Sequence, residues 1–543
     1  MDETARGRPR AVVALAVFAV AFALACTLLS PRWETNDDVG MAMAAHGFGL
    51  AVAPTPALIY SNVLWGHLVQ AIPSPGGILG YSVAMLASLF AAGAGLLCGL
   101  RRLGAGSPAA VAATVVAVLP AVVAPQFTIT AGLLAVAGVV AVLGYARSGG
   151  AGLLVAGVAL GFVAFLVRPE AALSVAAVAT PLLPWRALRR DRAMVVAAVV
   201  LVAACALATA VDRRAYAGDE WRAFLALEAP RAEFTDFGVG DRLLAQRPDL
   251  LRDAGYSAND VALLGDFFLA DRRLADPARL RAVLDAAGDG TAGGLAGGLA
   301  AIAALAAPRL APLLVLALVL GALRPSWRLG AAWAVFVALI FVLGASGRPG
   351  ADVLRVYVAP LVLLGVAALT AAGPGLARVP VGALQAAALL LALGWQGALT
   401  VPAALAAQRQ MAAIARDLPG FPAATVVAWG SEFPYRNAYP VLARDPAPRR
   451  LRLYALGTDT WAPYSLAAAE EAAGRGLVAR LQRGERVPLV ASDAEMELLR
   501  RWCAEHESGV LQVGDRLAPR RIRVVPVRCA ADVAAPARTG AGR

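Results

Sequence analysis

Charged residues are scarce in this sequence. Only 16% of its 543 residues are charged, whereas 59% are hydrophobic and the mean hydropathy is +0.66. Soluble domains carry about 25% charged residues, so this composition excludes an ordinary soluble globular protein. It predicts a mainly α-helical, polytopic membrane protein instead.

Lysine is absent altogether, and the formal net charge of +12 therefore comes from arginine alone. In a membrane protein the placement of the arginines says more than their sum, because short cytoplasmic loops collect basic residues. The net charge is thus no sign of a nucleic-acid partner, and we expect none.

Histidine and cysteine are also rare. The histidines His46, His67 and His506 lie far apart, and neither a CxxC nor an HxxxH spacing occurs, which excludes the usual sequence patterns of a zinc site. Three of the five cysteines lie in apolar runs. Cys503 and Cys529 share the polar C-terminal tail and can form a disulfide if that tail lies outside the cytoplasm.

Apolar sequence, by contrast, is abundant and comes in long runs. Their lengths and arginine-rich ends predict about eleven transmembrane helices. These spans are expected near residues 11–30, 77–99, 108–124, 129–145, 151–167, 171–185, 193–211, 308–323, 330–346, 353–371 and 382–402. The first run follows three arginines, as a signal sequence does, but roughly 20 apolar residues suffice to cross a bilayer, so we expect a retained span.

The arginine clusters also orient the bundle, because they belong on the cytoplasmic side. The N-terminus is then cytoplasmic. The sequence predicts a transmembrane domain over residues 1–402, with external loops 31–76 and 212–290, and a soluble extracytoplasmic domain over 403–543. One alternative is an extra span at 292–307, where Gly-Gly-Leu-Ala occurs twice, and it would reverse the sidedness of all that follows.

The tail differs from the bundle in its pattern. Short β-rich runs at 424–429, 487–491 and 522–527 alternate with helical segments at 466–483 and 494–506, which predicts a small α/β domain. The polar loop 212–290 contains helical runs such as 261–274 and is expected to be a helical insertion.

Acidic residues are concentrated outside the apolar scaffold. Of the 37 acidic residues, 15 lie between Asp212 and Asp289 and 14 between Asp417 and Asp532. The eight that remain are Asp2, Glu3, Glu34, Asp37, Asp38, Glu170, Asp191 and Asp352. A carboxylate near the hydrocarbon edge costs free energy unless it is paired, hydrated or functional. The three acids within residues 34–38, directly after the first span, are therefore the first candidate site.

Asp37 and Asp38 are the candidate catalytic residues of this cluster. Adjacent carboxylates at a membrane surface can orient an acceptor hydroxyl and take its proton, and one of them can bind a divalent cation such as Mg²⁺ or Mn²⁺. The structural alternative is that Asp38 caps a helix starting at Val39. Which of the two is the base stays open, whereas Glu34, beside Trp33, is interpreted as part of a span-end anchor.

This first loop resembles that of the polytopic glycosyltransferases of the GT-C superfamily, in the branch of dolichyl-phosphate-mannose and aminoarabinose transferases. That branch has an acidic pair in the first external loop, then an Ala-rich helix, a glycine and an aromatic interfacial helix. The counterparts here are Asp37-Asp38, Met41 to His46, Gly47, and Tyr60 to Leu68. The Lys-Pro-Pro-Leu element common there is replaced by Ile59-Tyr60-Ser61-Asn62, so the resemblance does not identify the donor sugar.

The resemblance implies a membrane glycosyltransferase at the outer face of the bacterial inner membrane. Such an enzyme transfers a sugar, with inversion, from a polyprenyl-phosphate donor to a glycan, lipid or protein acceptor, with a first-loop Asp as base. Departure of the lipid phosphate requires cations at headgroup depth, and arginine grips phosphate through two hydrogen bonds. Arg348, Arg355 and Arg168 lie at predicted outer span ends and are the candidate phosphate ligands.

Two of these arginines have a simpler alternative, since Arg168 can pair with Glu170 and Arg355 with Asp352 as structural ion pairs. Asn62, His67 and Glu170 are candidate acceptor or cavity residues. Glu432, Tyr435, Arg436 and Trp461 of the tail can bind an acceptor glycan or simply form domain surface and core.

Two functions of other classes fit the same composition. One is a transporter or flippase of a lipid-linked polar cargo, and the other is a non-enzymatic membrane scaffold. No clear internal repeat is present, and the acids gather at one surface rather than through the bilayer, so the sequence favours surface chemistry over transport.

Overall fold

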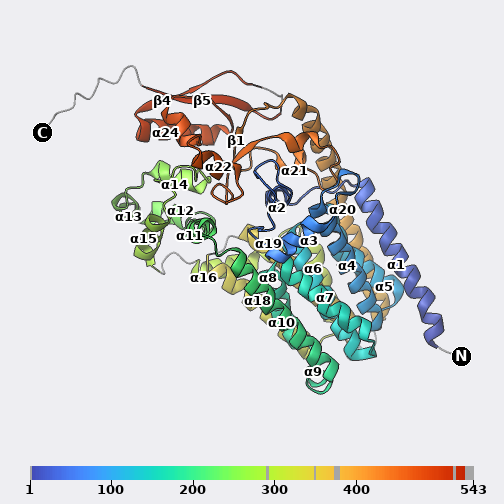
Figure 1. The fold of residues 1–543 in the computed structure, drawn as a ribbon. Helices are drawn as coiled ribbons and strands as arrows, with labels where there is room; N and C mark the ends of the chain where they lie inside the picture. The colour runs from blue at the N-terminus through green and yellow to red at the C-terminus, as the bar shows by residue number, and fades with distance from the viewer. Residues whose placement is uncertain (1–2, 289–292, 348–349, 372–379, 518–520, 532–543) are drawn as a thin grey trace.

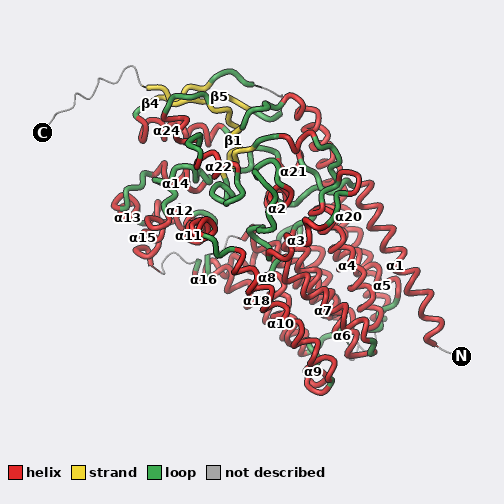
Figure 2. The backbone as a smooth tube through the Cα atoms, viewed as in Figure 1, coloured by secondary structure: helices red, strands yellow, loops and turns green. Residues whose placement is uncertain are grey.

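Long apolar helices form a bundle at one end of the molecule, and shorter helices with a sheet lie at the other (Figure 1, Figure 2). The computed structural model describes residues 3–288, 293–347, 350–371, 380–517 and 521–531. The side chains of residues 3–10 and 350–354 lie outside this description.

The predicted spans all coincide with helices of the bundle. These are α1 (Glu3–Leu28), α4 (Gly80–Arg102), α5 (Ser107–Val123), α6 (Phe127–Ser148), α7 (Ala151–Val167), α8 (Pro169–Ala179), α10 (Arg192–Ala215), α17 (Ala311–Leu323), α18 (Trp327–Ala345), α19 (Gly350–Thr370) and α20 (Val381–Asp417). Within the described residues, 6 helices are long and apolar enough to cross a membrane, or 7 with one bent pair, and the others are shorter. A mainly α-helical, polytopic membrane protein is thereby confirmed, and the number of spans stays a prediction.

Residues 292–307 do not form a separate straight span. The main described element of this segment is α16 (Gly294–Ala303), a helix of 10 residues. Together with the turn that follows it, α16 makes an angle of 87° with α17. Ten residues rise about 15 Å, half of the hydrocarbon core. The helix packs closely on α18, where a Cβ on Gly297 would lie 2.5 Å from the Gly344 carbonyl oxygen.

The first external loop contains the two helices that the sequence predicts. The Ala-rich helix is α2 (Asn36–His46), and it ends at Gly47 in the left-handed conformation, φ +67°. The aromatic helix is α3 (Val63–Ala71), and it begins later than predicted because the Asn62 side chain caps it, accepting from the Leu64 amide at 3.0 Å.

The insertion is helical, as expected, but its helices are short. Its elements are α11 (Asp219–Phe234), α12 (Val239–Gln246), α13 (Pro248–Asp253), α14 (Ala258–Gly265) and α15 (Pro277–Ala287). The short helix before α10 is α9 (Trp185–Arg190). The helix predicted at 261–274 stops at Gly265, and Phe267 follows with a positive φ of 62°. The insertion shares one hydrophobic core with the tail, in which Phe268 lies 5.0 Å from Trp429 between ring centroids.

The tail is a five-stranded mixed sheet in the order β2-β1-β3-β5-β4. Its strands are β1 (Val426–Trp429), β2 (Leu453–Leu456), β3 (Val487–Val490), β4 (Gly509–Val513) and β5 (Val524–Ala531), and its helices are α21 (Tyr435–Ala438), α22 (Leu466–Ala472), α23 (Leu477–Gln482) and α24 (Asp493–Glu507). The first three strands run parallel, and β5 is antiparallel to β3 and β4. The proposed boundary at 402 falls inside α20, which carries the chain without a break to Asp417.

The two cysteines of the tail form a disulfide. Cys503 of α24 and Cys529 of β5 are buried, and their Cα atoms lie 5.8 Å apart. The bond ties the helix to the antiparallel half of the sheet. Cys26, Cys98 and Cys205 are free.

We expect reduction of this disulfide to destabilise the tail by about 3 kcal/mol, because the cross-link closes a loop of 26 residues in the unfolded chain. The melting temperature of the purified protein, followed by tryptophan fluorescence, should fall with reductant. The Cys503→Ser/Cys529→Ser variant should melt at that lower temperature without responding to reductant, and Cys26→Ser should behave as the native chain does. A native protein that ignores reductant would contradict the bond.

Candidate active site

A pocket of about 460 Å³ opens between the bundle and the first external loop. Apolar residues of α5, α17 and α20 line it on the side of the bundle, among them Ala121, Leu313 and Leu399. The charged groups of its lining are Arg32, Glu34, Arg309, Arg355 and Arg436. The pocket therefore joins an apolar slot between membrane helices to a positively charged rim.

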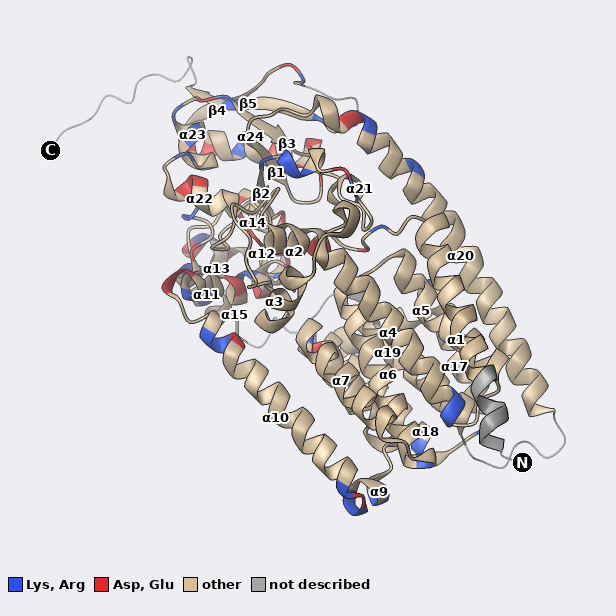
Figure 3. Ribbon diagram, turned by 45° about the vertical axis from the view of Figure 1, so that its right-hand side comes forward, with Lys and Arg blue, Asp and Glu red and all other residues tan. Residues whose placement is uncertain are grey.

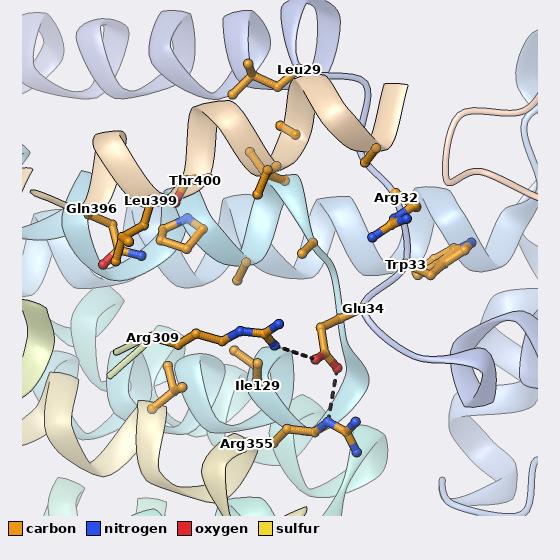
Figure 4. Close-up of a pocket in the computed structure, with 18 of the residues that line it drawn as sticks. Leu29, Arg32, Trp33, Glu34, Ile129, Arg309, Arg355, Gln396, Leu399 and Thr400 are labelled. Atoms are coloured by element: carbon orange, nitrogen blue, oxygen red, sulfur yellow. Dashed lines mark hydrogen bonds and ion pairs between the residues drawn. The ribbon is translucent and has the colours of Figure 1, made fainter. Parts of the chain in front are cut away.

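Glu34 lies between two of these arginines (Figure 4). Its Oε2 accepts from Arg355 Nε at 3.0 Å, and its Oε1 lies 3.9 Å from Arg309 Nη1. Arg355 and Glu34 are partly buried, whereas 87% of the Arg309 side chain is exposed. Glu34 is thus a pocket residue and not merely part of a span-end anchor.

The tail completes the rim. Arg436 of α21 donates from Nη1 to the Glu34 carbonyl oxygen at 2.7 Å, and Arg32 donates to Asn437 Oδ1 at 3.0 Å. Burial and the neighbouring charge of Arg436 lower the pKa of Arg32. Arginine stays charged in proteins at neutral pH, so the two guanidinium groups hold positive charge close together at the pocket.

The adjacent carboxylates of α2 have opposite environments. Asp38 is completely buried, and it accepts hydrogen bonds from Thr35 Oγ1 at 2.9 Å and from Tyr81 Oη at 3.0 Å. Burial raises the pKa of Asp38 well above its usual range. The helix starts at Asn36, so Asp38 lies in its first turn and is not its cap, contrary to the structural alternative.

Asp37 is only partly buried. Its charge contributes to raising the pKa values of Tyr60 and Asp459, which places both groups within its electrostatic reach. Gly40, three residues further on and hence on the same side of α2, contacts the tail directly, because a Cβ there would lie 3.1 Å from Asp459 Oδ2. Asp37 and Asp459 therefore meet where the tail docks on α2.

Asp459 is the functional candidate that the sequence did not single out. Its Oδ1 accepts from Tyr464 Oη at 2.8 Å, and burial is the main cause that raises its pKa to about 6, with the charges of Asp37 and Glu228 adding to it. Glu228 comes from the insertion, where it pairs with the buried Arg231 at 2.7 Å. Three segments far apart in the chain thus place carboxylates together, and no local sequence pattern marks this.

The predicted phosphate ligands are distributed unequally. Arg355 lines the pocket, and Arg348 and the side chain of Asp352 lie outside the described residues. Arg168 does not line the pocket. It pairs with Glu170 at 3.1 Å, as the structural alternative has it. It also donates to the Tyr60 carbonyl oxygen at 3.1 Å and lies over the Tyr60 ring, so it borders the Asp37 side of the site.

The predicted acceptor residues lie further from the pocket. Asn62 is buried as the cap of α3 and donates to the Ala208 carbonyl oxygen at 3.0 Å. His67 is exposed on α3, and the Glu170 carboxylate is mostly exposed beside Arg168. None of the three lines the pocket. The pocket arginines Arg32 and Arg309 were missed. A lone arginine at the start of a predicted span is the signal that could have found Arg309.

A metal ion at Asp37 or Asp38 stays a prediction. Asp38 offers a completely buried carboxyl, whereas Asp37 is only partly buried and is hence the more accessible donor of the two. Within the described chain, three potential ligand atoms converge to within 4.8 Å only at Asp260, Glu505 and His506, between the insertion and the tail.

Comparisons with known proteins add a structural match. No family model and no curated protein matches the sequence. Among solved structures, ArnT from Cupriavidus metallidurans bound to undecaprenyl phosphate matches 97% of this chain and 99% of its own length, at 15% identity and a TM-score of 0.38. At this identity and TM-score no residue role or activity can be transferred from it.

Asp459 should destabilise the folded protein at neutral pH. Its carboxyl is protonated in the folded and unfolded chains below about pH 4, but between pH 4 and 6 the unfolded chain loses the proton first, because burial raises the folded pKa to about 6. We therefore expect Asp459→Asn to raise stability by roughly 3 kcal/mol at pH 7.5 and by less than about 1 kcal/mol at pH 4.

The measurement is the melting temperature of both proteins across this pH range. Asp515→Asn, which alters an exposed carboxylate of the same tail, is the matched control and should change nothing. A variant less stable than the native chain at pH 7.5 would show that Asp459 is held as a paired anion.

Proposed function

We propose that this chain is an integral membrane glycosyltransferase that transfers a sugar from a polyprenyl-phosphate donor to an extracytoplasmic glycan, lipid or protein. The observation that carries the proposal is the pocket, in which an apolar slot between membrane helices ends at four arginines. Glu34, which also lines the pocket, lies three residues before Asp37. A lipid-linked phosphate needs this combination, because its chain is apolar and its head is anionic.

The donor phosphate binds at the rim. Arg355 and Arg309 already hold an anion there, the carboxylate of Glu34, so the rim is suited to negative charge. A phosphodiester that enters the pocket takes up part of their hydrogen bonding, and Glu34 keeps the two guanidinium groups in position between turnovers. The polyprenyl chain lies along α5, α17 and α20, where the wall is apolar.

Asp37 acts as the base in a single displacement. It takes the proton of the acceptor hydroxyl, the hydroxyl oxygen forms a bond to the anomeric carbon, and the bond from that carbon to the phosphate oxygen breaks. The electron pair leaves with the polyprenyl phosphate, whose added charge the arginines stabilise. Attack opposite to the leaving group inverts the anomeric carbon.

Asp38 is a positioning residue in this mechanism. Its hydrogen bonds from Thr35 and Tyr81 anchor the first turn of α2 to the bundle, and no substrate reaches its buried carboxyl. The orientation inferred from the arginine clusters completes the proposal, with the N-terminus in the cytoplasm of a bacterium and the tail outside its inner membrane.

The two carboxylates should respond differently to removal of their charge. Asp37→Asn should lower kcat for sugar transfer by about 100-fold or more, since a base is lost. Asp38→Asn should cost less than about tenfold, because an amide oxygen still accepts from a hydroxyl and burial already favours a neutral group there. Transfer by purified protein from a polyprenyl-phosphate donor, assayed with total membrane glycans and lipids as acceptors, measures both.

Full activity in both variants would rule out a first-loop aspartate as base. A larger loss in Asp38→Asn than in Asp37→Asn would assign the base to Asp38, provided that both variants melt as the native protein does.

Loss of a rim arginine should weaken binding of the donor rather than binding of the acceptor. Arg355→Ala removes a charged ligand of the phosphate and leaves Glu34 with the exposed Arg309, so we expect the KM for the donor to rise by about tenfold to 100-fold. Arg409→Ala, an exposed arginine of α20 outside the pocket lining, is the matched control. An unchanged donor KM in Arg355→Ala, with the acceptor KM raised instead, would contradict this placement of the phosphate.

A further inference from the structure

A second polar pocket lies at the opposite end of the bundle. It has a volume of about 210 Å³ and is formed where α4, α6, α17 and α19 end, beside the beginning of α20. The active-site loop adjoins the other ends of these helices, with α4 beginning after α3 and α6 beginning at Phe127 beside Tyr60. Figure 3 shows arginines at these far ends of the bundle helices.

The polar side chains of this pocket offer hydrogen-bond donors and positive charge. Arg147 of α6, Arg324 at the end of α17 and Gln385 of α20 line it, and no acidic residue is among its described lining. Nothing in the described lining therefore neutralises the two guanidinium groups.

Two buried donors point to a missing partner. Gln385 is 7% exposed, and its Nε2 has no hydrogen-bond partner within the described residues. Arg324 Nε is also buried and has no hydrogen-bond partner within the described residues. Nη1 of the same side chain donates to the Ala371 carbonyl oxygen at 2.9 Å. An unpaired buried donor costs about 1–3 kcal/mol, and a single oxygen-rich anion can satisfy both.

Arg147 adds a third donor from the outer side of the pocket. Its guanidinium lies over the turn between α4 and α5, where Nη2 is 3.6 Å from the position of a Cβ on Gly104. Gly104 has a positive φ of 95°, so the turn keeps the space beside the guanidinium open. The pocket volume equals that of roughly seven water molecules, which is enough for a phosphate group with its ester oxygens.

We propose that this pocket binds the phosphate group of an anionic phospholipid in the membrane leaflet opposite the active site. Arg147, Arg324 and Gln385 donate to its oxygens. Helix ends lie at headgroup depth, and basic pockets between membrane helices on the cytoplasmic side select anionic lipids. The arginine clusters assign this end of the bundle to the cytoplasm.

The test is lipid retention by the purified full-length protein, measured by native mass spectrometry after addition of phosphatidylglycerol or phosphatidylcholine. We expect the native chain to bind phosphatidylglycerol at least tenfold more tightly than phosphatidylcholine. Arg147→Gln/Arg324→Gln should lose this preference, and Gln385→Leu should weaken phosphatidylglycerol binding by about fivefold. Arg328→Gln, an exposed arginine near the same end that does not line the pocket, should keep both affinities.

Sodium phosphate distinguishes a lipid from a soluble ligand. If it raises the melting temperature of the native protein but not of Arg147→Gln/Arg324→Gln, and no lipid preference is found, the site binds a soluble phosphate compound and the lipid assignment is wrong. Equal binding of both lipids without any phosphate effect overturns the site itself. Neither result depends on sugar transfer, because only binding and melting are measured.

Discussion

The docking of the first external loop between the bundle and the tail is the constraint on which the rest of the site depends. On one side, backbone hydrogen bonds join Arg32 and Glu34 to the turn between α5 and α6. On the other side, Gly49 and Leu50 accept from amides of the tail at 3.1 and 2.7 Å. Because the loop is held from both sides, α2 has one orientation, and one segment of the chain reaches both the arginine rim and the carboxylates of the tail.

The three acids of the first loop then differ in their surroundings, and hence in their proposed roles. Glu34 is held by arginines, Asp38 is completely buried and held by two hydroxyl groups, and Asp37 is partly buried within electrostatic reach of Asp459. Acidic side chains thus serve as a counter-ion, an anchor and the proposed base within five positions. Desolvation is the largest cause that raises the pKa values of both Asp38 and Asp459, so the protein spends stability to keep carboxyl groups at this junction.

Sequence reasoning found the first-loop acids and Arg355 because each breaks a local rule, namely that charges avoid the ends of apolar spans on the outer side. Arg168 breaks the same rule but is bound by Glu170, which shows that the rule finds candidates and not roles. Asp459 and Glu228 break no rule in their own polar segments, and the tail offered Arg436 only as a candidate glycan ligand. They become site residues only through contacts across more than 190 positions of the chain, and nothing local records such contacts.

By itself, the sequence determined the class of protein, the positions of the apolar helices, the mixed α/β tail and the acidic first loop, since all of these follow from local composition and periodicity. Only the tertiary structure decided which of two adjacent aspartates is buried, which arginines share a pocket and which tail residue faces α2. The physical reason is that hydrophobic burial along a helix is a local property of the chain. Desolvation and ion pairing depend instead on which residues of other segments pack against a charged group, and only the tertiary structure decides this.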